Sequence, residues 1–265
     1  MKHLETICVQ GGWQPGNGEP RVLPIYQSTT FKYDTSEQMA RLFDLKDEGY
    51  FYTRLANPTN DAVAKKIAAL EGGVGAVLTS SGQAANFYAT FNICEEGDHM
   101  ISSSAIYGGT FNYLRHTFPQ FGVTTTFVSP DEPANFEAAI TPKTKLIFIE
   151  SIGNPNANLI DVEAVANIAH SHHIPLVVDN TFATPYLVRP IEYGADIVVH
   201  SATKFIGGHG TTIGGVIVDS GKFDWEASGK FASLTDPNPS YHGISFTKAV
   251  GAAAFVTKIR AILLR

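Results

Sequence analysis

Short apolar runs alternate with helical segments through most of this chain, and no other feature of the sequence constrains its fold as strongly. Segments with helical spacing lie near residues 61–72, 84–93, 110–118, 135–140, 162–170 and 190–193. The apolar runs have the length of strands and lie at residues 76–78, 99–101, 124–128, 145–149, 175–178, 197–199 and 215–218. Strands separated by helices predict an α/β fold with a mostly parallel, seven-stranded sheet covered on both faces. Ligands bind such sheets beyond the carboxyl ends of the strands, so residues that follow the strands are the candidates for function.

The two ends of the chain depart from this pattern. Residues 1–50 are rich in turn formers, as in GGWQPGNGEP (11–20), and are predicted to form an irregular arm with one helix over 35–45. After Ser220 the chain is predicted to be irregular through LTDPNPSYHG (234–243) and then helical from residue 246 to the end.

The composition excludes several classes of function. The net charge is −6 and no Lys/Arg-rich run occurs, so neither nucleic acid nor an anionic membrane is an expected partner. Cys8 and Cys94 lie far apart, which excludes a disulfide framework and a cysteine-rich zinc site. No secretory leader and no stretch of about 18 apolar residues occurs, so a cytoplasmic location is expected. The histidines at 170, 172 and 173 lie at a predicted helix end without partners at metal-ligand spacing, and no metal site is expected.

Lys204 follows an apolar run in the segment IVVHSATKFIGGHGTTIGG (197–215). Its neighbours are small or apolar, so the amine is expected to be desolvated, which favours the neutral form that attacks an aldehyde. Ser201 and Thr203 offer hydroxyl groups to a phosphate, and the glycines that follow allow the backbone to bend closely. A lysine in a loop can equally be a solvated surface residue, and the segment alone leaves both interpretations open.

Asp179 ends the apolar run of LVVDNTFA (176–183) and also has two interpretations. The carboxylate can cap the helix that follows, or it can be the anion that keeps the ring nitrogen of a pyridine-type cofactor protonated.

Two further segments lie between a strand and a helix. TSSGQAA (79–85) places small residues at a helix N-terminus, which favours either an anion site or an ordinary cap by Ser80 or Ser81. IYGGT (106–110) places Tyr107 after a strand end, either packed at the rim or stacked on a planar cofactor and passing protons.

Together these segments resemble the Cys/Met-metabolism family of pyridoxal-5′-phosphate (PLP) enzymes, which have the aspartate-aminotransferase-like fold (fold type I). The resemblance extends through nearly the whole chain and includes YTRLANPT (52–59), TSSGQAA (79–85), ESIGNP (150–155), DNTFATP (179–185) and HSATKFIGGHG (200–210).

The resemblance implies a role for each matching residue. Lys204 forms the Schiff base with PLP, Asp179 pairs with the pyridine nitrogen, and Tyr107 stacks on the ring and takes part in catalysis. Tyr52 and Arg54 reach the phosphate in a neighbouring subunit of a homodimer or homotetramer. The other residues implied to contact the cofactor are Ser81, Gly82, Gln83, Glu150, Asn154, Ser201 and Thr203, with Glu150 supporting Asn154.

The resemblance also implies a domain organisation. Residues 1–55 form an arm that contacts a neighbouring subunit, residues 56–245 form the PLP-binding domain, and residues 246–265 begin a C-terminal domain. Most of that C-terminal domain, which in the family supplies an arginine for the substrate carboxylate, is expected to be missing, so the chain resembles a fragment.

Within the family the sequence resembles O-acetylhomoserine sulfhydrylases, through SSGQAA (80–85), DNTFATPYLVRP (179–190), GGVIVDSGKFDW (214–225) and LTDPNPSYHG (234–243). The implied reaction is a γ-replacement on O-acetyl-L-homoserine by sulfide or a small thiol, giving homocysteine or methionine plus acetate. The alternatives are a cystathionine γ-synthase, a methionine or cystathionine γ-lyase, and a PLP-binding fragment with little activity. Methionine γ-lyases resemble the chain less, because they carry Cys where it has Gly109. A nicotinamide oxidoreductase would need GxGxxG at the first helix, which residues 79–85 lack.

Overall fold

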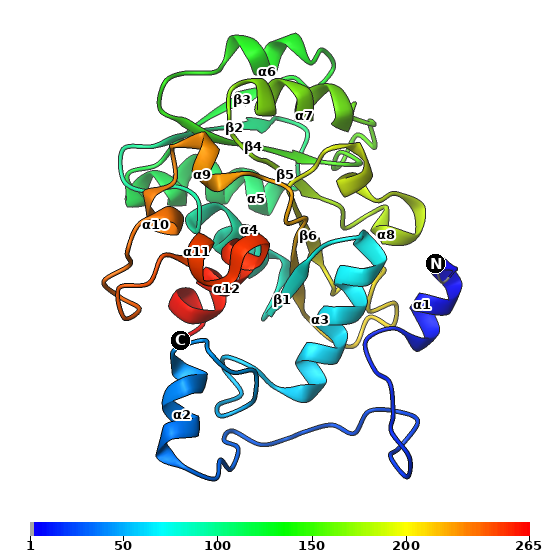
Figure 1. The fold of residues 1–265 in the computed structure, drawn as a ribbon. Helices are drawn as coiled ribbons and strands as arrows, with labels where there is room; N and C mark the ends of the chain where they lie inside the picture. The colour runs from blue at the N-terminus through cyan, green and yellow to red at the C-terminus, as the bar shows by residue number, and fades with distance from the viewer. Residues whose placement is uncertain (1–2) are drawn as a thin grey trace.

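The computed structural model describes residues 3–265, and its central feature is one seven-stranded sheet with the order β1-β7-β6-β5-β4-β2-β3 (Figure 1). Strands β6, β5, β4, β2 and β3 are parallel, and β7 runs antiparallel between β1 and β6. The mostly parallel α/β sheet predicted from the sequence is therefore confirmed. The strand bounds are β1 Gly75–Thr79, β2 His99–Ser103, β3 Thr124–Val128, β4 Thr144–Glu150, β5 Leu176–Asp179, β6 Ile197–Ser201 and β7 Gly215–Asp219.

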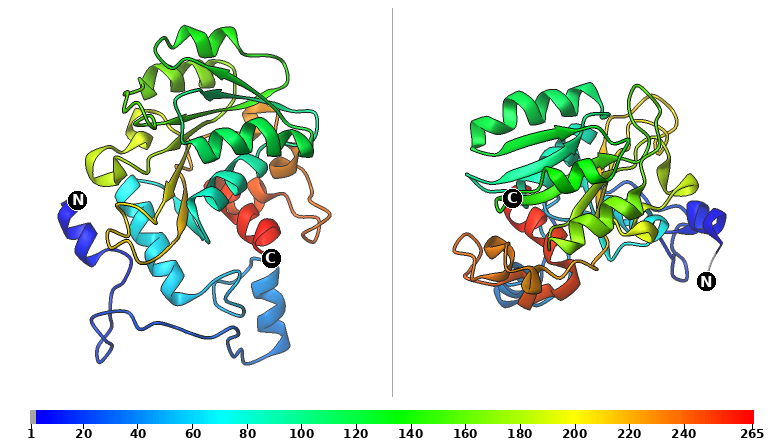
Figure 2. Two further views of the ribbon diagram at one scale, coloured as in Figure 1. Left: turned by 180° about the vertical axis from the view of Figure 1, so that it is seen from behind. Right: turned by 90° about the horizontal axis from the view of Figure 1, so that it is seen from above.

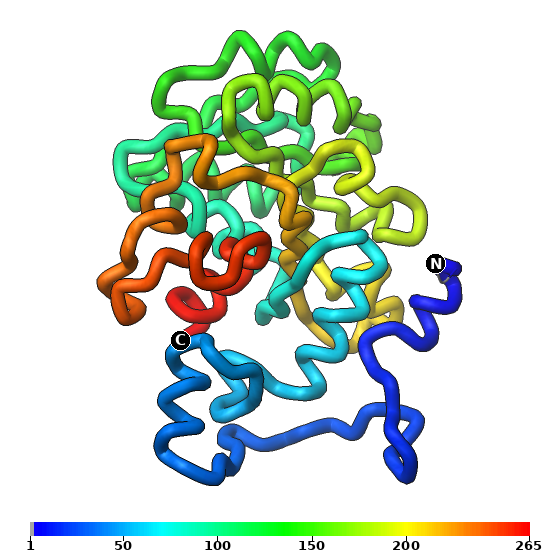
Figure 3. The backbone as a smooth tube through the Cα atoms, viewed as in Figure 1, coloured from blue at the N-terminus to red at the C-terminus, as the bar shows by residue number. Residues whose placement is uncertain are grey.

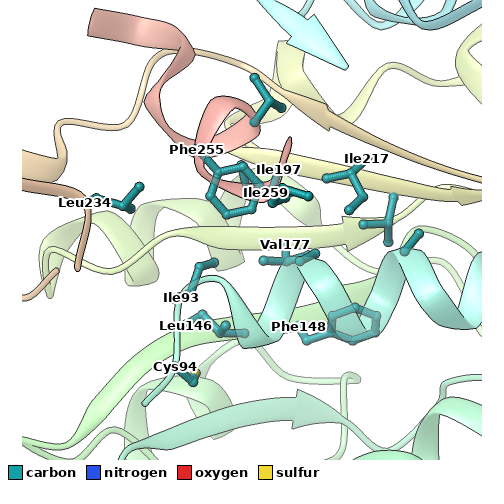
Figure 4. Packing of buried hydrophobic residues seen from close by; sticks show 14 of the residues in the cluster. Ile93, Cys94, Leu146, Phe148, Val177, Ile197, Ile217, Leu234, Phe255 and Ile259 are labelled. Atoms are coloured by element: carbon teal, nitrogen blue, oxygen red, sulfur yellow. The ribbon is translucent and has the colours of Figure 1, made fainter. Parts of the chain in front are cut away.

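Both faces of the sheet are buried, which explains why its strands appear in the sequence as continuous apolar runs. Alternate residues of one strand enter different cores: Val177 points to the first core, and its neighbours Leu176 and Val178 point to the second. The first core includes residues of α4 and of the C-terminal helices, as Figure 4 shows for Phe255 and Ile259 beside Val177. The second core includes residues of α3 and α7.

The helices lie close to the positions that the sequence predicts. α3 begins with the Asn57 side chain accepting from the Thr59 amide and ends at Gly72 in the left-handed conformation, the predicted stop. The bounds are α1 Leu4–Gln10, α2 Ser36–Phe43, α3 Pro58–Glu71, α4 Gly82–Phe91, α5 Gly108–Asn112, α6 Ala134–Ala138, α7 Val162–Ser171, α8 Thr184–Leu187, α9 Trp225–Ser228, α10 Ala232–Thr235, α11 Phe246–Val250 and α12 Ala254–Lys258. Shorter 3-10 turns cover Phe118–Phe121, Pro190–Tyr193 and Gly251–Ala253, and π-helical turns cover Tyr113–Thr117 and Ile259–Leu263.

The N-terminal segment differs from the irregular arm expected over residues 1–50, because α1 is helical. Leu4 and Ile7 lie on one face of α1 and pack against the second core, which stabilises a short helix that has no side-chain cap. The rest of the segment up to α2 runs along the lower edge of the molecule, away from the sheet (Figures 1, 2 and 3). Its apolar side chains Val22 and Ile25 are more than four-fifths exposed.

Residues 220–265 also hold more regular structure than the sequence predicts. α9 and α10 form within the segment expected to be irregular, where Trp225, Phe231 and Leu234 enter the first core. The predicted C-terminal helix is divided into α11, α12, the 3-10 turn Gly251–Ala253 and the π-helical turn Ile259–Leu263. Lys258 fixes this region to α4, since its Nζ donates to the Asn92 carbonyl oxygen (2.9 Å) at the end of α4.

Candidate active site

The predicted functional residues gather around a cavity of about 640 Å³ at the carboxyl ends of the parallel strands. Ten of the twelve predicted site residues line this cavity: Ser81, Gly82, Gln83, Tyr107, Glu150, Asn154, Asp179, Ser201, Thr203 and Lys204. The other two, Tyr52 and Arg54, line a separate pocket, with the Arg54 guanidinium 4.8 Å from the centre of the Tyr52 ring. The fold therefore brings together residues that span more than 120 positions of the sequence.

Lys204 lies in the loop after β6, and its backbone is fixed on both sides. Its amide donates to the Ser201 carbonyl oxygen (3.2 Å), and its own carbonyl oxygen accepts from the Gly208 amide (2.9 Å). The expected desolvation of the side chain is wrong, because Lys204 is exposed. The apolar neighbour Phe205 is itself 64 % exposed and points away from the core, so it does not cover the amine.

The N-terminus of α4 offers an anion site beside β6. Ser81 is the helix cap and accepts from the Ala84 amide (3.0 Å), so its hydroxyl group has the capping role that the sequence left open. The amides of Gly82 and Gln83 have no hydrogen-bond partner within the helix, and they form the positive end of the helix dipole. A Cβ on Gly82 would lie 2.5 Å from the Ser201 Cβ, so only glycine permits this close approach of helix and strand. The free amides of Gly82 and Gln83, together with the hydroxyl group of Ser201, fit a phosphate.

Asp179 forms the floor of the cavity, at the end of β5. Its Oδ1 accepts from the Thr181 amide (3.0 Å) and hydroxyl group (2.5 Å), and its Oδ2 accepts from Asn86 Nδ2 (3.4 Å). Burial raises the pKa of Asp179, while the bonds from Thr181, the nearby His200 charge and Asn86 act to lower it. The carboxylate caps a turn at Thr181 and not the next helix, which begins at Thr184. A buried anion held by donors fits a protonated ring nitrogen.

Glu150 ends the neighbouring strand and holds the loop of Tyr107. Its Oε1 accepts from the Tyr107 amide at 2.7 Å. Burial, and next the Asp179 charge, raise the pKa of Glu150 to about 8, although the Tyr107 bond acts to lower it. The hydrogen bond that Glu150 forms is with the Tyr107 amide, and within residues 3–265 none joins it to Asn154, so its support of Asn154 stays a prediction.

Besides Thr181, which lines the cavity and holds Asp179, the sequence did not predict Asn86 and Thr110 as residues of the site. Both are buried, and Asn86 Nδ2 lies 3.1 Å from Thr110 Oγ1 and 3.4 Å from Asp179 Oδ2. Thr110 Oγ1 in turn donates to Gln83 Oε1 (3.0 Å). These contacts connect α4, α5 and β5 beneath the cavity. The signal for Asn86 was its spacing, since it lies one helical turn after Gly82 and therefore on the same face of α4.

A second buried network supports the floor from below. His200 Nε2 lies 2.6 Å from Glu71 Oε1, and both side chains are fully buried. The Asn180 amide group donates to the same oxygen (3.1 Å), which ties the residues after β5 and within β6 to the end of α3. His200 therefore has a structural role in this network.

The lining has the chemistry for a cofactor with a phosphate at one end and a basic ring nitrogen at the other. An amide-lined helix end, a buried carboxylate, a rim tyrosine and a lysine amine all face one cavity. Among the described residues no group of three or more His, Cys, Asp and Glu side chains could hold a metal ion. None of the helices described is both long and apolar enough to span a bilayer.

The model for the Cys/Met metabolism PLP-dependent enzyme family matches residues 5–255. The O-acetyl-L-homoserine sulfhydrylase of Leptospira meyeri is 48% identical over 93% of this chain and 56% of its own length. The homocysteine synthase of Schizosaccharomyces pombe is 48% identical over 100% of this chain and 62% of its own length. The chain thus spans about three-fifths of the length of the curated relatives it matches.

Two solved structures also resemble this chain. A putative O-acetylhomoserine (thiol)-lyase from Campylobacter jejuni, crystallised with pyridoxyl-lysine monophosphate, superimposes with a TM-score of 0.95 at 33% identity, covering 100% of this chain and 66% of that one. The metB protein of Corynebacterium glutamicum gives a TM-score of 0.78 at 34% identity, with 97% and 64% covered.

Proposed function

The chain belongs to the Cys/Met metabolism family of PLP-dependent enzymes, and from this premise we propose that its cavity binds PLP for a γ-replacement on O-acetyl-L-homoserine. Sulfide or a small thiol is the proposed second substrate, and homocysteine or methionine plus acetate are the proposed products. The observation that carries the proposal is the meeting of Lys204 and Asp179 with the α4 N-terminus in one cavity.

The residues of the cavity fit the parts of the cofactor. Gly82, Gln83 and Ser201 would hold the phosphate, Asp179 the ring nitrogen, and Lys204 the aldehyde carbon through a covalent bond. Thr203 Oγ1 already exchanges hydrogen bonds with the Gly214 backbone (3.1 and 3.2 Å), so it would contribute by holding the lysine loop. When bound, PLP supplies an electron sink for negative charge that develops on the substrate carbons.

The side chains around that sink would move the protons. Once the substrate amine has displaced it from the aldehyde carbon, the Lys204 amine would accept the proton that leaves the substrate Cα and would transfer protons at Cβ. Tyr107, at the rim, would assist acetate as it leaves Cγ with the bonding electron pair, after which the sulfur nucleophile adds to Cγ. Asp179 would remain an anion throughout and keep the proton on the ring nitrogen.

Two alternatives share the same cofactor residues, a cystathionine γ-synthase and a methionine or cystathionine γ-lyase. The names of the relatives favour the sulfhydrylase. Product analysis separates them: with O-acetylhomoserine, sulfide should yield homocysteine, whereas cysteine should yield little cystathionine and no ketoacid. Preferential formation of cystathionine, or release of a ketoacid, would contradict the proposal.

We propose separately that this chain has a low kcat/KM, because the carboxylate of an amino-acid substrate is best held by an arginine. Among the described residues no arginine lines the cavity. Arg260 instead binds Asp61 (3.0 Å), and Arg41 binds Asp47. We expect these 265 residues to bind PLP yet to have a kcat/KM far below that of the longer Leptospira relative, assayed at equal PLP content. Equal kcat/KM values would mean that a local arginine, Arg54 or Arg115, holds the carboxylate.

Assembly and location complete the proposal. Tyr52 and Arg54 lie outside the cavity of their own chain, which supports a role in the site of a second copy within a homodimer or homotetramer. Residues 1–55 are the proposed contacting arm, residues 56–245 the PLP-binding domain and residues 246–265 the start of a further domain. A cytoplasmic location suits a biosynthetic enzyme of this family.

A further inference from the structure

Glu71, the last residue of α3, contacts the ends of two neighbouring strands. Its Oε1 lies 2.6 Å from the Nε2 of His200 in β6 and accepts a hydrogen bond (3.1 Å) from the Nδ2 of Asn180, the residue after β5. All three side chains are at most 1 % exposed. A single buried oxygen atom therefore joins the ends of β5 and β6.

This contact lies on the face of the sheet opposite to the cavity. Val198, two positions before His200, enters the second core together with residues of α3, whereas Val199 enters the first core. Because side chains alternate along a strand, His200 points away from the cavity, and Ser201, which lines the cavity, points towards it. Glu71 itself does not line the cavity, so it acts on a bound molecule only through the strand ends.

The register pairing between β5 and β6 stops before it reaches Ser201. The last register pair of the two strands is Asp179 with Val199. Beyond this pair, side chains take part in holding the strand ends together. On the cavity side the Ser201 amide donates to Thr181 Oγ1 (2.8 Å), and on the opposite side Glu71 joins the two ends. The distance between Asp179 and Ser201 therefore depends on these side-chain hydrogen bonds.

Asn180 transmits the contact with Glu71 to Asp179, the residue that precedes it. Its Oδ1 accepts from Ser151 Oγ (2.8 Å), and its Nδ2 donates both to Glu71 and to the Val188 carbonyl oxygen (2.9 Å). Both polar atoms of this side chain therefore have partners. A buried amide group that is held in three directions makes the backbone that carries it rigid.

We propose that Glu71 is a positioning residue for the cofactor, which sets the distance between the Asp179 carboxylate and the phosphate site at Ser201. It does so by accepting hydrogen bonds from the ends of both strands. The proposal rests on the proposed binding of PLP, whose ring nitrogen and phosphate must reach the two groups at once. A ligand without the phosphate needs only the Asp179 end, so its affinity depends much less on that distance.

The test compares Glu71→Asp with Glu71→Gln. Aspartate keeps the carboxylate but is one methylene group shorter, so its oxygen does not reach both partners. Glutamine keeps the length and the acceptor oxygen without the charge. Its amide nitrogen takes the place of Glu71 Oε2, which has no hydrogen-bond partner within residues 3–265. Absorbance titration of the cofactor-free chain measures the affinities for PLP and for pyridoxal, which lacks the phosphate.

The expected result is a change in the preference for PLP over pyridoxal. Glu71→Asp should weaken PLP binding about tenfold and pyridoxal binding no more than about threefold, because only PLP needs both ends of the site in place. Glu71→Gln should keep the preference of the parent. The control is Thr144→Val, which removes buried hydrogen bonds with His99 and the Thr141 amide at the opposite edge of the sheet. It should leave the preference unchanged.

Two results would overturn the proposal. The first is an unchanged preference in Glu71→Asp, with both ligands bound equally well or weakened by the same factor, as a general loss of stability would give. The second is an equal loss of preference in Glu71→Gln, which would assign the effect to the charge and not to the hydrogen bonds. If the parent chain bound neither PLP nor pyridoxal, the proposed function would fail instead, so the two failures are distinguishable.

Discussion

Asp179 and Glu150 are register partners at the carboxyl ends of the adjacent parallel strands β5 and β4. Both are buried, and the pKa of each is raised by that burial. The Asp179 charge also contributes to the raised pKa of Glu150, about 8, so a charge on one carboxyl group disfavours a charge on the other. Three donors around the oxygens of Asp179 favour its charged form, and we propose that Asp179 provides the anion.

This division of roles predicts different results for two isosteric changes. Asp179→Asn removes the anion and should lower turnover by about 10²-fold or more, the effect of losing one preorganised electrostatic group. PLP affinity should fall less. Glu150→Gln removes the other carboxyl group, keeps an acceptor for the Tyr107 amide, and should lower turnover less than Asp179→Asn. Steady-state rates and PLP affinities of both variants check this, and near-normal turnover of Asp179→Asn would remove Asp179 from the mechanism.

Asp219, at the end of β7, predicts a pH dependence of stability that is independent of the cavity. Burial raises its pKa from 3.8 to about 7. The folded chain then holds a proton that the unfolded chain releases, so the unfolding free energy should fall as pH rises from about 4 to about 7. Asp219→Asn keeps an acceptor for the Gly221 amide and removes the titrating group. Between about pH 4 and pH 7, the unfolding free energy of the variant should rise by roughly 2–4 kcal/mol relative to that of the parent.

Urea unfolding at several pH values measures this gain. The control is Asp236→Asn at an exposed position, which should leave the pH dependence of the parent unchanged. A constant difference between the parent and Asp219→Asn from pH 4 to pH 7 would show that Asp219 does not titrate in that range.

The position of Arg54 predicts complementation between two inactive variants. An Arg54→Ala chain keeps its own Lys204, and a Lys204→Ala chain keeps its own Arg54, so a mixed oligomer contains some sites with both. Refolding the two chains together should restore part of the PLP binding that neither has alone. A monomeric sedimentation profile without complementation would argue that each site is built within one chain.

Much of the fold could be predicted, because strands buried on both faces leave continuous apolar runs in the sequence. The end of such a run gave the place of Asp179, and the loop after another gave Lys204. The contact of Asn86 with Asp179 could not be predicted, since it joins residues 93 positions apart and depends on how α4 packs on the sheet. The exposure of Lys204 was missed for the same reason: whether apolar neighbours such as Phe205 cover an amine depends on where they point.

We propose that Lys204 is the amine that holds PLP. Borohydride reduction of the protein loaded with PLP, followed by digestion and mass spectrometry of the labelled peptide, tests this. We expect one pyridoxyl group on Lys204 and no stable label in Lys204→Ala. The competing amine is Lys258, which burial leaves with a pKa of about 8 and which binds Asn92 and Ser233. Label on Lys258, or spread over several surface lysines, would show that Lys204 is not the residue that holds PLP.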